Sequence, residues 1–325
     1  MKYAVFYLRI YRFSLEAIVL EKNMPQTTLA RPVSFTGIGL HSGKDVQIKL
    51  QPASINTGLT FFVHTSSGTQ QIKPHPEAVS ATALATTLSN GKVGVSTVEH
   101  ILAALAGLEI DNVQVHVLGG EIPIMDGSAL QAVQLINQAG TRTQLAPRWA
   151  ARIKRPVSVA GEGKAIHARP YSGFMVNYTI DFPHEAIGKQ SFSLEITPES
   201  FAEIAYARTF GFLQEVEYLH SKGLALGGSL ANAVVLDDEG VINVEGLRSP
   251  DEFVRHKMLD FVGDMAMLGL PLKGAFDVHC SGHHHNNVFL RHLLDNDDLY
   301  LDIASDSEPE RFVRPNRIAV AAGMA

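Results

Sequence analysis

The chain has 325 residues, 46% of them hydrophobic, and its 33 acidic residues outnumber its 27 basic ones. This length favours two domains, and the net charge of −6 disfavours a nucleic-acid partner. The single cysteine, Cys280, excludes a disulfide within the chain and fits a reducing compartment. The apolar run at 101–108 is far shorter than the roughly 20 residues that cross a bilayer. We expect a cytoplasmic monomer with no stable membrane insertion.

Residues 1–26 form an N-terminal extension with a composition of its own. Aromatic and apolar residues predominate, but Arg9 and Arg12 interrupt them and no small-residue cleavage site follows, so they do not match a secretory signal. A membrane-surface helix is one alternative, and a start of the working protein at Met24 is another. We expect the extension to be poorly ordered and to lie outside the fold.

The first half of the chain alternates strand patterns with helix patterns. Hydrophobic residues at 46–50 and 59–63 predict strands, and the strict alternation at 113–117 predicts a half-buried antiparallel strand. Helices are expected at 96–108 and at 128–139.

The polar segment 141–150, which contains Pro147, is the expected linker. Beyond it, strands again come before helices. The longest helix is expected from Ser249, with Pro250 at its first position and Glu252 at capping-box spacing. The other expected elements are strands at 153–159, 164–168, 174–180 and 275–280, and helices at 198–206, 215–222 and 287–294.

The order of these elements predicts the fold class. Strands come in runs and do not alternate strictly with helices, so the expected class is α+β. Each half has a sheet and two principal helices, which suggests a duplication. We expect domain I at residues 27–143, domain II at 151–300 and a C-terminal tail at 301–325.

A stripe of histidine and aspartate is the sharpest chemical signal. His256, Asp260 and Asp264 are spaced four residues apart, so a helix places them on one face. A histidine and an aspartate at this spacing can hold one cation. A solvated helix face with a His–Asp ion pair would have the same pattern.

A second signal stands at the start of an earlier helix. Ser96 and Glu99 have capping-box spacing, so Glu99 could simply cap the helix. Alternatively, the positive end of the helix dipole keeps His100 neutral and ready to bind a metal. Glu99 could then be the general base of a hydrolytic zinc site.

Three consecutive histidines at 283–285 form the third signal, and we expect them in a loop after a strand. They could be a metal patch or incidental surface residues. One of them could also be a general acid, since histidine titrates near neutral pH. Asp264 would then be its natural partner.

Together these segments resemble the zinc-dependent UDP-3-O-acyl-N-acetylglucosamine deacetylases of lipid A biosynthesis. The resemblance runs from about residue 27 to residue 294, in the order of that family. The matching segments are GIGLHSG at 37–43, STVEH at 96–100, EIPIMDGS at 121–128, ARTFGF at 207–212, LGGS at 226–229, FVRHKMLD at 253–260 and SGH at 281–283.

The resemblance implies both a fold and a metal. The fold would be two similar β-α-α-β sandwich domains of the ribosomal protein S5 domain 2 type, each with a small insert, and the active site would lie in the cleft between them. One Zn²⁺ would be bound by His100, His256 and Asp260, with a coordination position left for water. Fe²⁺ is the alternative metal.

The resemblance also implies an amide hydrolysis with named roles. How the proton transfers are divided between Glu99 and His283 stays open. The implied roles are Glu99 as acceptor of the proton of water, Thr209 as stabiliser of the oxyanion, His283 as the positive group that protonates the amine, Asp264 as the partner that orients His283, and Lys257 as a substrate contact near the metal.

The implied substrate is UDP-3-O-acyl-N-acetylglucosamine, which water would convert to UDP-3-O-acyl-glucosamine and acetate. Phe182 resembles an aromatic residue that packs on the uracil, and His41 resembles an auxiliary histidine at the mouth of the site. Their alternatives are an ordinary core and a surface histidine. The other expected substrate contacts, several of them along a passage for the acyl chain, are Phe210, Phe212, Leu213, Val216, Ala225, Gly228, Ser229 and Val235.

Some positions depart from the family pattern. Residues 84–87 contain no cysteine, although many members have one near the metal, and Glu215 and Cys280 replace an expected aspartate and an expected basic residue. Three other functions stay open: deacetylation of another N-acetyl sugar, a non-catalytic metal-binding relative, and a nucleic-acid-binding module, which the acidic charge disfavours.

Overall fold

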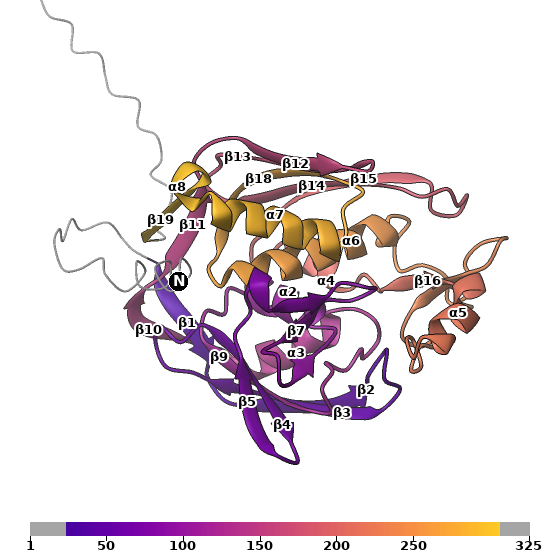
Figure 1. The fold of residues 1–325 in the computed structure, drawn as a ribbon, viewed down its shortest axis with the longest axis horizontal. Coiled ribbons are helices and arrows are strands. Elements are labelled where there is room, and N and C mark those ends of the chain that lie inside the picture. The colour runs from indigo at the N-terminus through magenta and orange to yellow at the C-terminus, as the bar shows by residue number, and fades with distance from the viewer. Residues whose placement is uncertain (1–23, 306–325) are drawn as a thin grey trace, which may run out of the picture.

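A computed structural model describes residues 24–305 of the chain. Two mixed β-sheets form opposite faces of the molecule, and the main helices lie between them (Figure 1). This architecture belongs to the expected α+β class. No helix within residues 24–305 is both long enough and apolar enough to span a membrane.

The first sheet, at the bottom of Figure 1, has the strand order β2-β3-β9-β4-β5. The alternation that predicted β9 places Val113, Val115 and Val117 in the core, while Gln114 and His116 are half-buried on the other face. β9 runs antiparallel to β3, as expected, but parallel to β4, so the sheet is mixed. The strands are β2 (Val33–Ile38), β3 (Asp45–Pro52), β9 (Val113–Leu118), β4 (Leu59–Thr65) and β5 (Gly68–Ile72).

Helices α2 (Glu99–Gly107) and α3 (Leu130–Ala139) lie on the inner side of this sheet (Figure 1). Both begin slightly later than predicted, and α3 ends at Ala139, just before Gly140, whose φ of +69° stops the helix. Nearly every residue of α2 is buried, because the helix lies between the first sheet and α6 (Glu252–Met265).

The second sheet is built around β18 (Leu272–His279), which is antiparallel to β13 (Lys164–Arg169) and parallel to β14 (Phe174–Asp181). The strand expected at 153–159 is instead two strands, and β15 has no counterpart among the predicted ones. The remaining strands are β11 (Trp149–Ile153), β12 (Val157–Gly161), β15 (Lys189–Glu195) and β19 (Leu301–Ser305).

Helices α6 and α7 (His283–Asp295) lie against the inner face of the second sheet (Figure 1). The ring of Phe276 in β18 lies 5.8 Å from that of Phe261 in α6 and 6.1 Å from that of Phe289 in α7. All three rings are fully buried. This aromatic core holds α6, which carries two predicted metal ligands, in place on the sheet.

Smaller elements complete the described chain. The paired strands are β1 (Pro25–Leu29) with β10 (Thr141–Pro147), β6 (Val79–Ala81) with β7 (Thr87–Ser89) and β8 (Gly94–Val95), and β16 (Phe210–Phe212) with β17 (Val234–Leu236). The short helices are η1 (Pro76–Ala78), α4 (Ala202–Ala205), η2 (Leu213–Glu215), α5 (Val216–Ser221), η3 (Ala266–Leu268) and α8 (Asp297–Tyr300).

The predicted linker at 141–150 is wrong, because β10 and the start of β11 occupy it. Its polar residues suggested a loop, but one of them is part of a buried hydrogen-bond network. The Gln144 amide donates to the Ala53 carbonyl at 2.8 Å and accepts from Asn112 at 2.8 Å. A buried, hydrogen-bonded amide cannot be told from an exposed one by composition.

The expected ends of the fold also shift. β1 begins at Pro25, inside the predicted N-terminal extension. β19 lies inside the predicted C-terminal tail, yet it pairs with β11 and so belongs to the second sheet. Residues 1–23 and 306–325, to which the rest of those two predictions refers, lie outside the described residues.

Two helix starts in the second half differ from the prediction. α6 begins at Glu252 and not at Ser249. The Glu252 carboxylate accepts hydrogen bonds from Arg208 and from the Arg248 backbone, so it is not the capping-box partner of Ser249 that the spacing predicted. α7 begins at His283, so the three histidines expected in a loop form its first turn.

Candidate active site

Three side chains predicted as metal ligands meet between α2 and α6. His100 comes from the first turn of α2, and His256 and Asp260 stand one turn apart on α6. Oδ1 of Asp260 lies 3.3 Å from Nε2 of His256 and 3.5 Å from Nε2 of His100. One ligand atom from each residue lies within 4.8 Å of the other two, and all three residues are buried.

These donor atoms fit a divalent cation. Two ligands on a tetrahedral zinc ion, each at about 2.0–2.1 Å, stand about 3.3–3.4 Å apart, which matches the separations around Asp260. Its Oδ1 atom is buried and has no hydrogen-bond partner in residues 24–305. Because a buried acceptor without a partner is costly, a cation between Oδ1 and the two imidazoles would stabilise the site.

Neighbouring groups orient the ligands and set their charge. Nδ1 of His256 lies 3.1 Å from the Ala207 carbonyl oxygen, so Nδ1 carries the proton and Nε2 faces Asp260. Burial lowers the pKa of His256 to about 3, which keeps the imidazole neutral. Nζ of Lys257 lies 2.7 Å from Oδ2 of Asp260. Burial acts to raise the pKa of Asp260, but the neighbouring charge of Lys257 holds it well below its usual range.

Glu99, the first residue of α2, does not cap its own helix. Its Oε2 accepts the backbone N–H of Thr86 at 3.0 Å, whereas the N–H of Ser96 donates to the carbonyl of Gly120. The capping interpretation is therefore wrong. Burial raises the pKa of Glu99, although the charge of His283 opposes this. A carboxylate of raised pKa is suited to accept a proton near neutral pH.

His283, the first residue of α7, faces the same site. Its Nδ1 lies 2.8 Å from Oδ2 of Asp264, and its Nε2 lies 4.0 Å from Oδ2 of Asp260. Burial acts to lower the pKa of His283, but Asp264, Asp260 and Glu99 outweigh it and raise that pKa to about 9. The ring is therefore positively charged. Since Asp260 and Asp264 are both buried, the alternative of a solvated helix face is wrong.

Three phenylalanines predicted as substrate contacts adjoin this cluster. The ring of Phe210 lies 6.2 Å from that of His256 and 5.6 Å from that of Phe182. Phe212 lies 6.3 Å from Phe182, and Nζ of Lys257 lies 5.7 Å from the centre of the Phe210 ring. The structure thus places an aromatic surface beside the candidate metal ligands.

Four further predicted residues lie around the loop before β17. Nδ1 of His41 accepts the N–H of Ala225 at 3.4 Å, and the N–H of Gly228 donates to the Ala225 carbonyl. The N–H of Ser229 is bound by the side chain of Asn232 at 2.8 Å. His41 is therefore close to residues that lie far from it in the sequence.

The last four predicted residues lie along β16, α5 and β17. The backbone of Thr209 bonds to Gly127 and Val234, just before β16. Leu213, in η2, is 47% exposed, Val216 begins α5, and Val235 pairs with Gly211 across β16 and β17. These positions adjoin Phe210 and Phe212 along the chain or across the β16–β17 pairing, and they are not part of the titratable cluster.

Two residues that were not among the predicted site residues complete the cluster. The Thr86 hydroxyl donates to Oδ1 of Asp264 at 2.7 Å, and the Asn286 amide donates to Oδ2 of Asp264 at 2.8 Å. Asn286 lies one helical turn after His283, so a helix beginning at His283 would have indicated it. Thr86 lies in the segment 84–87, which the resemblance places near the metal, but that signal did not single out its side chain, because its partners come from distant helices.

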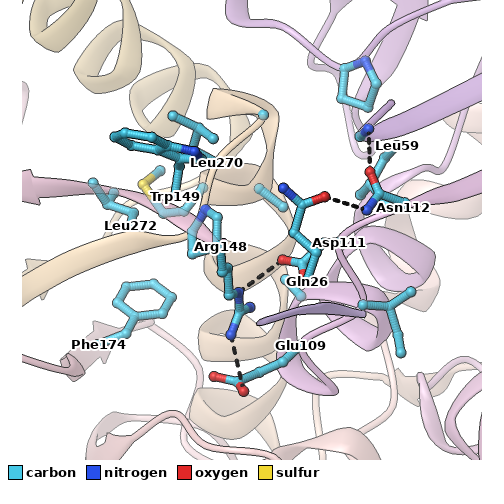
Figure 2. Close-up of a pocket in the computed structure, with 18 of the residues that line it drawn as sticks. Gln26, Leu59, Glu109, Asp111, Asn112, Arg148, Trp149, Phe174, Leu270 and Leu272 are labelled. Atoms are coloured by element: carbon cyan, nitrogen blue, oxygen red, sulfur yellow. Dashed lines mark hydrogen bonds and ion pairs between the residues drawn. The ribbon is translucent and has the colours of Figure 1, made fainter. Parts of the chain in front are cut away.

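A cavity of about 440 Å³ lies elsewhere in the molecule (Figure 2). Apolar side chains, among them Trp149 and Phe174, face polar ones across it, and Arg148 pairs with Asp111 at 2.8 Å and with Glu109 at 3.0 Å. None of the predicted site residues lines this cavity. The titratable cluster, and not the cavity, therefore locates the candidate chemistry.

Known proteins resemble the chain over most of its length. The model of the family "UDP-3-O-acyl N-acetylglycosamine deacetylase" matches residues 26–295. Three relatives bear the name UDP-3-O-acyl-N-acetylglucosamine deacetylase. The one from Nitratidesulfovibrio vulgaris is 60% identical over 279 residues, covering 86% of this chain and 91% of its own. The one from Oleidesulfovibrio alaskensis is 55% identical over 286 residues, covering 88% and 94%. The one from Lawsonia intracellularis is 52% identical over 278 residues, covering 86% and 91%. The chain belongs to the UDP-3-O-acyl N-acetylglycosamine deacetylase family.

Proposed function

We propose that this chain is a zinc-dependent amidohydrolase that removes the N-acetyl group of UDP-3-O-acyl-N-acetylglucosamine. The products are UDP-3-O-acyl-glucosamine and acetate, and the reaction is the committed step of lipid A biosynthesis. The observation that carries the proposal is the buried trio of His100, His256 and Asp260, with Glu99 and His283 close enough to influence its charge. The names of relatives 52–60% identical to the chain support this substrate.

We assign the trio of His100, His256 and Asp260 to Zn²⁺. Three nitrogen and oxygen ligands without a thiolate are typical of catalytic zinc sites, which keep one position open. When bound, Zn²⁺ supplies a Lewis acid that polarises the acetamide carbonyl and makes water more acidic. The same donors accept Fe²⁺, so the metal identity is an outcome of the test below.

Glu99 is the proposed acceptor of the proton of the attacking water. The Thr86 N–H occupies its Oε2, which leaves Oε1 as the proton acceptor. Because burial raises the pKa of Glu99, that pKa is closer to the operating pH than the pKa of an exposed glutamate. The carboxylate can then take up the proton in the transition state.

His283 is the proposed donor of a proton to the departing amine nitrogen. Asp264 holds its Nδ1, so the Nε2–H is the donor that faces Asp260 and the interior of the site. A pKa of about 9 keeps the ring protonated at neutral pH. Thr209 would stabilise the oxyanion, and Lys257 would contact the substrate near the ligands.

The remaining predicted residues are proposed to bind the substrate. The surface of Phe182, Phe210 and Phe212 is suited to stacking on uracil. His41 would stand at the mouth of the site. Leu213, Val216, Ala225, Gly228, Ser229 and Val235 would border a passage for the acyl chain.

The finer fold assignment is also a proposal. We propose two similar β-α-α-β sandwich domains of the ribosomal protein S5 domain 2 type, at residues 27–143 and 151–300, each with a small insert. The site would lie in the cleft between them, since Glu99 and His100 come from the first and His256 and Asp260 from the second. We further propose a cytoplasmic monomer, and the single cysteine supports a reducing compartment.

The test measures acetate released per bound metal. We expect release from UDP-3-O-acyl-N-acetylglucosamine, loss of activity on chelation and recovery with Zn²⁺. Glu99→Ala should keep its zinc and lose activity by about 10²- to 10⁴-fold, the usual contribution of a general base. Equal activity on UDP-N-acetylglucosamine without an acyl chain would contradict the assigned substrate, and recovery with Fe²⁺ but not Zn²⁺ would contradict the assigned metal. A fully active Glu99→Ala variant would contradict its role.

A further inference from the structure

Thr86 contacts a carboxylate on each of the two helices that form the site. Its backbone N–H donates to Oε2 of Glu99 in α2 at 3.0 Å, and its hydroxyl donates to Oδ1 of Asp264 in α6 at 2.7 Å. Thr86 itself is 2% exposed. A single buried residue therefore links the proposed proton acceptor to the partner of the proposed proton donor.

The hydroxyl of Thr86 completes the hydrogen bonding of Asp264. Oδ2 of Asp264 accepts from Nδ1 of His283 and from the Asn286 amide, each at 2.8 Å. Oδ1 accepts from Thr86 alone among the hydrogen bonds within residues 24–305. Without that hydroxyl, a buried carboxylate oxygen would lose its partner, and the carboxylate could rotate away from His283.

In a variant of the same size as threonine, water could not replace the hydroxyl. Thr86, Asp264, His283 and Asn287 line a narrow crevice that leaves no room for a water molecule in the described part of the chain. An isosteric valine would put a methyl group against Oδ1 of Asp264. In such a variant, Oδ1 of Asp264 would therefore lose the hydrogen bond that the Thr86 hydroxyl donates.

We propose that Thr86 is a positioning residue of the deacetylase: anchored by its N–H on Glu99, it holds Asp264 with its hydroxyl and thereby fixes the direction of the His283 ring. The proposal rests on the proposed function, in which Glu99 and His283 move the protons. Thr86 would touch neither substrate nor metal and would act only through Asp264. Its partner on α6 is 178 positions away in the sequence.

The first experiment compares Thr86→Val with Thr86→Ser at saturating zinc. Thr86→Val should lower kcat by about 10- to 100-fold, the fold-change for losing a hydrogen bond to a charged group, with KM and bound zinc unchanged. Thr86→Ser, which keeps the hydroxyl, should restore most of the rate. If Thr86→Val does not fold, the pair Thr86→Ser and Thr86→Ala makes the same comparison, since the two differ only by the hydroxyl.

Thr28→Val is the matched control for a lost buried hydroxyl. Thr28 is fully buried, and its hydroxyl bonds to the backbone of Asn112 and Ala53, away from the titratable cluster. We expect this variant to lower the thermal midpoint and leave kcat unchanged. If Thr86→Val behaves like Thr28→Val, losing stability but keeping kcat, the positioning role is refuted.

A double-mutant cycle with Asp264→Ala separates positioning from general structural damage. If the hydroxyl acts through Asp264, adding Thr86→Val to Asp264→Ala should change kcat by less than about 2-fold, because residues that act as a unit are not additive. The NMR signal of the His283 Nδ1–H proton should also shift in Thr86→Val and return in Thr86→Ser. Additive losses, or an unchanged Nδ1–H signal, would overturn the proposal.

The two proposals fail in distinguishable ways. No acetate release by the wild-type protein would refute the proposed function and the role of Thr86 with it. An active wild-type protein with an inactive Glu99→Ala, together with a fully active Thr86→Val, would refute the role of Thr86 alone.

Discussion

Gly263 in α6 lies directly against the backbone of Glu99 in α2. A Cβ at position 263 would fall 2.0 Å from the Glu99 carbonyl oxygen, a contact that cannot be relieved by moving a side chain. The glycine therefore sets the distance between the two helices. That distance brings His100 next to His256 and Asp260.

Gly263→Ala tests this relationship. Helix propensity alone favours alanine by about 0.8–1.0 kcal/mol, but the contact with backbone should reverse the sign. We expect a net loss of about 1–3 kcal/mol in the free energy of unfolding, typical of overpacking, together with weaker zinc binding. Urea unfolding and metal analysis measure the two effects.

Gly161→Ala is the control for that substitution. Gly161 is exposed, at the end of β12, and nothing lies within 4 Å of where its Cβ would be. We expect a change within about 0.5 kcal/mol. A Gly263→Ala protein as stable as wild type, with normal zinc content, would contradict the assigned role of the close approach.

Zinc should stabilise the folded protein through Asp260. A ligand that binds only the folded state adds about 2.7 kcal/mol to the free energy of unfolding when its free concentration is 100 times its dissociation constant. We expect calorimetry to show this gain when Zn²⁺ is added to metal-depleted protein, and Asp260→Ala to abolish it. Asp45→Ala, at an exposed position of β3, should keep the full gain. A gain that survives in Asp260→Ala would place the ion elsewhere.

The stability of the metal-free protein should depend on the charge of His283. Its pKa is raised from 6.5 to about 9 in the folded state, so the folded protein holds this proton more tightly than the unfolded one. The resulting stabilisation is fully present below about pH 6.5 and is lost as the pH rises through about 9. Urea unfolding across this range measures the loss. Asp264→Asn, which removes the main raising charge, should flatten the profile, and an equally steep profile in that variant would contradict the assignment.

The buried pair of Arg208 and Glu252 should stabilise the start of α6. Nε of Arg208 lies 2.9 Å from Oε1 of Glu252, and both side chains are at most 3% exposed. Glu252→Leu leaves a buried guanidinium without its main partner, so we expect a loss of about 3–5 kcal/mol in the free energy of unfolding. Because Ala207, beside Arg208, orients His256, zinc affinity should fall as well.

The double variant Arg208→Met/Glu252→Leu is the comparison for that prediction. Replacing a whole buried ion pair by apolar residues is often neutral or stabilising. We therefore expect the double variant to be more stable than Glu252→Leu alone. A double variant that is less stable would mean that the pair contributes through contacts other than its charge.

Much of the fold follows from local patterns in the chain. The alternation at Val113, Val115 and Val117 predicts β9 and its buried face, and the spacing of His256 and Asp260 predicts one face of α6. Capping-box spacing was a less reliable predictor than hydrophobic alternation and helical spacing. Glu99 and Glu252 both stand at capping-box spacing, yet each carboxylate binds a distant partner, Thr86 or Arg208.

Errors arose where polarity was taken for exposure. Gln144 suggested a linker but lies buried in β10, where its amide is bonded to Asn112 and Ala53. The histidines from His283 suggested a loop but begin α7, where His283 is held by Asp264. In both cases the partner that stabilises the polar group is far away in the sequence.

The sequence by itself determined the residue types of the site and the helices and strands that carry most of them, because hydrophobic periodicity and helical spacing are local properties. The tertiary structure alone decided that His100 faces Asp260, that Glu99 is bonded to Thr86 and that Thr86 reaches Asp264. Each of these contacts depends on how closely α2 and α6 pack, and that packing is set by buried surfaces from both halves of the chain.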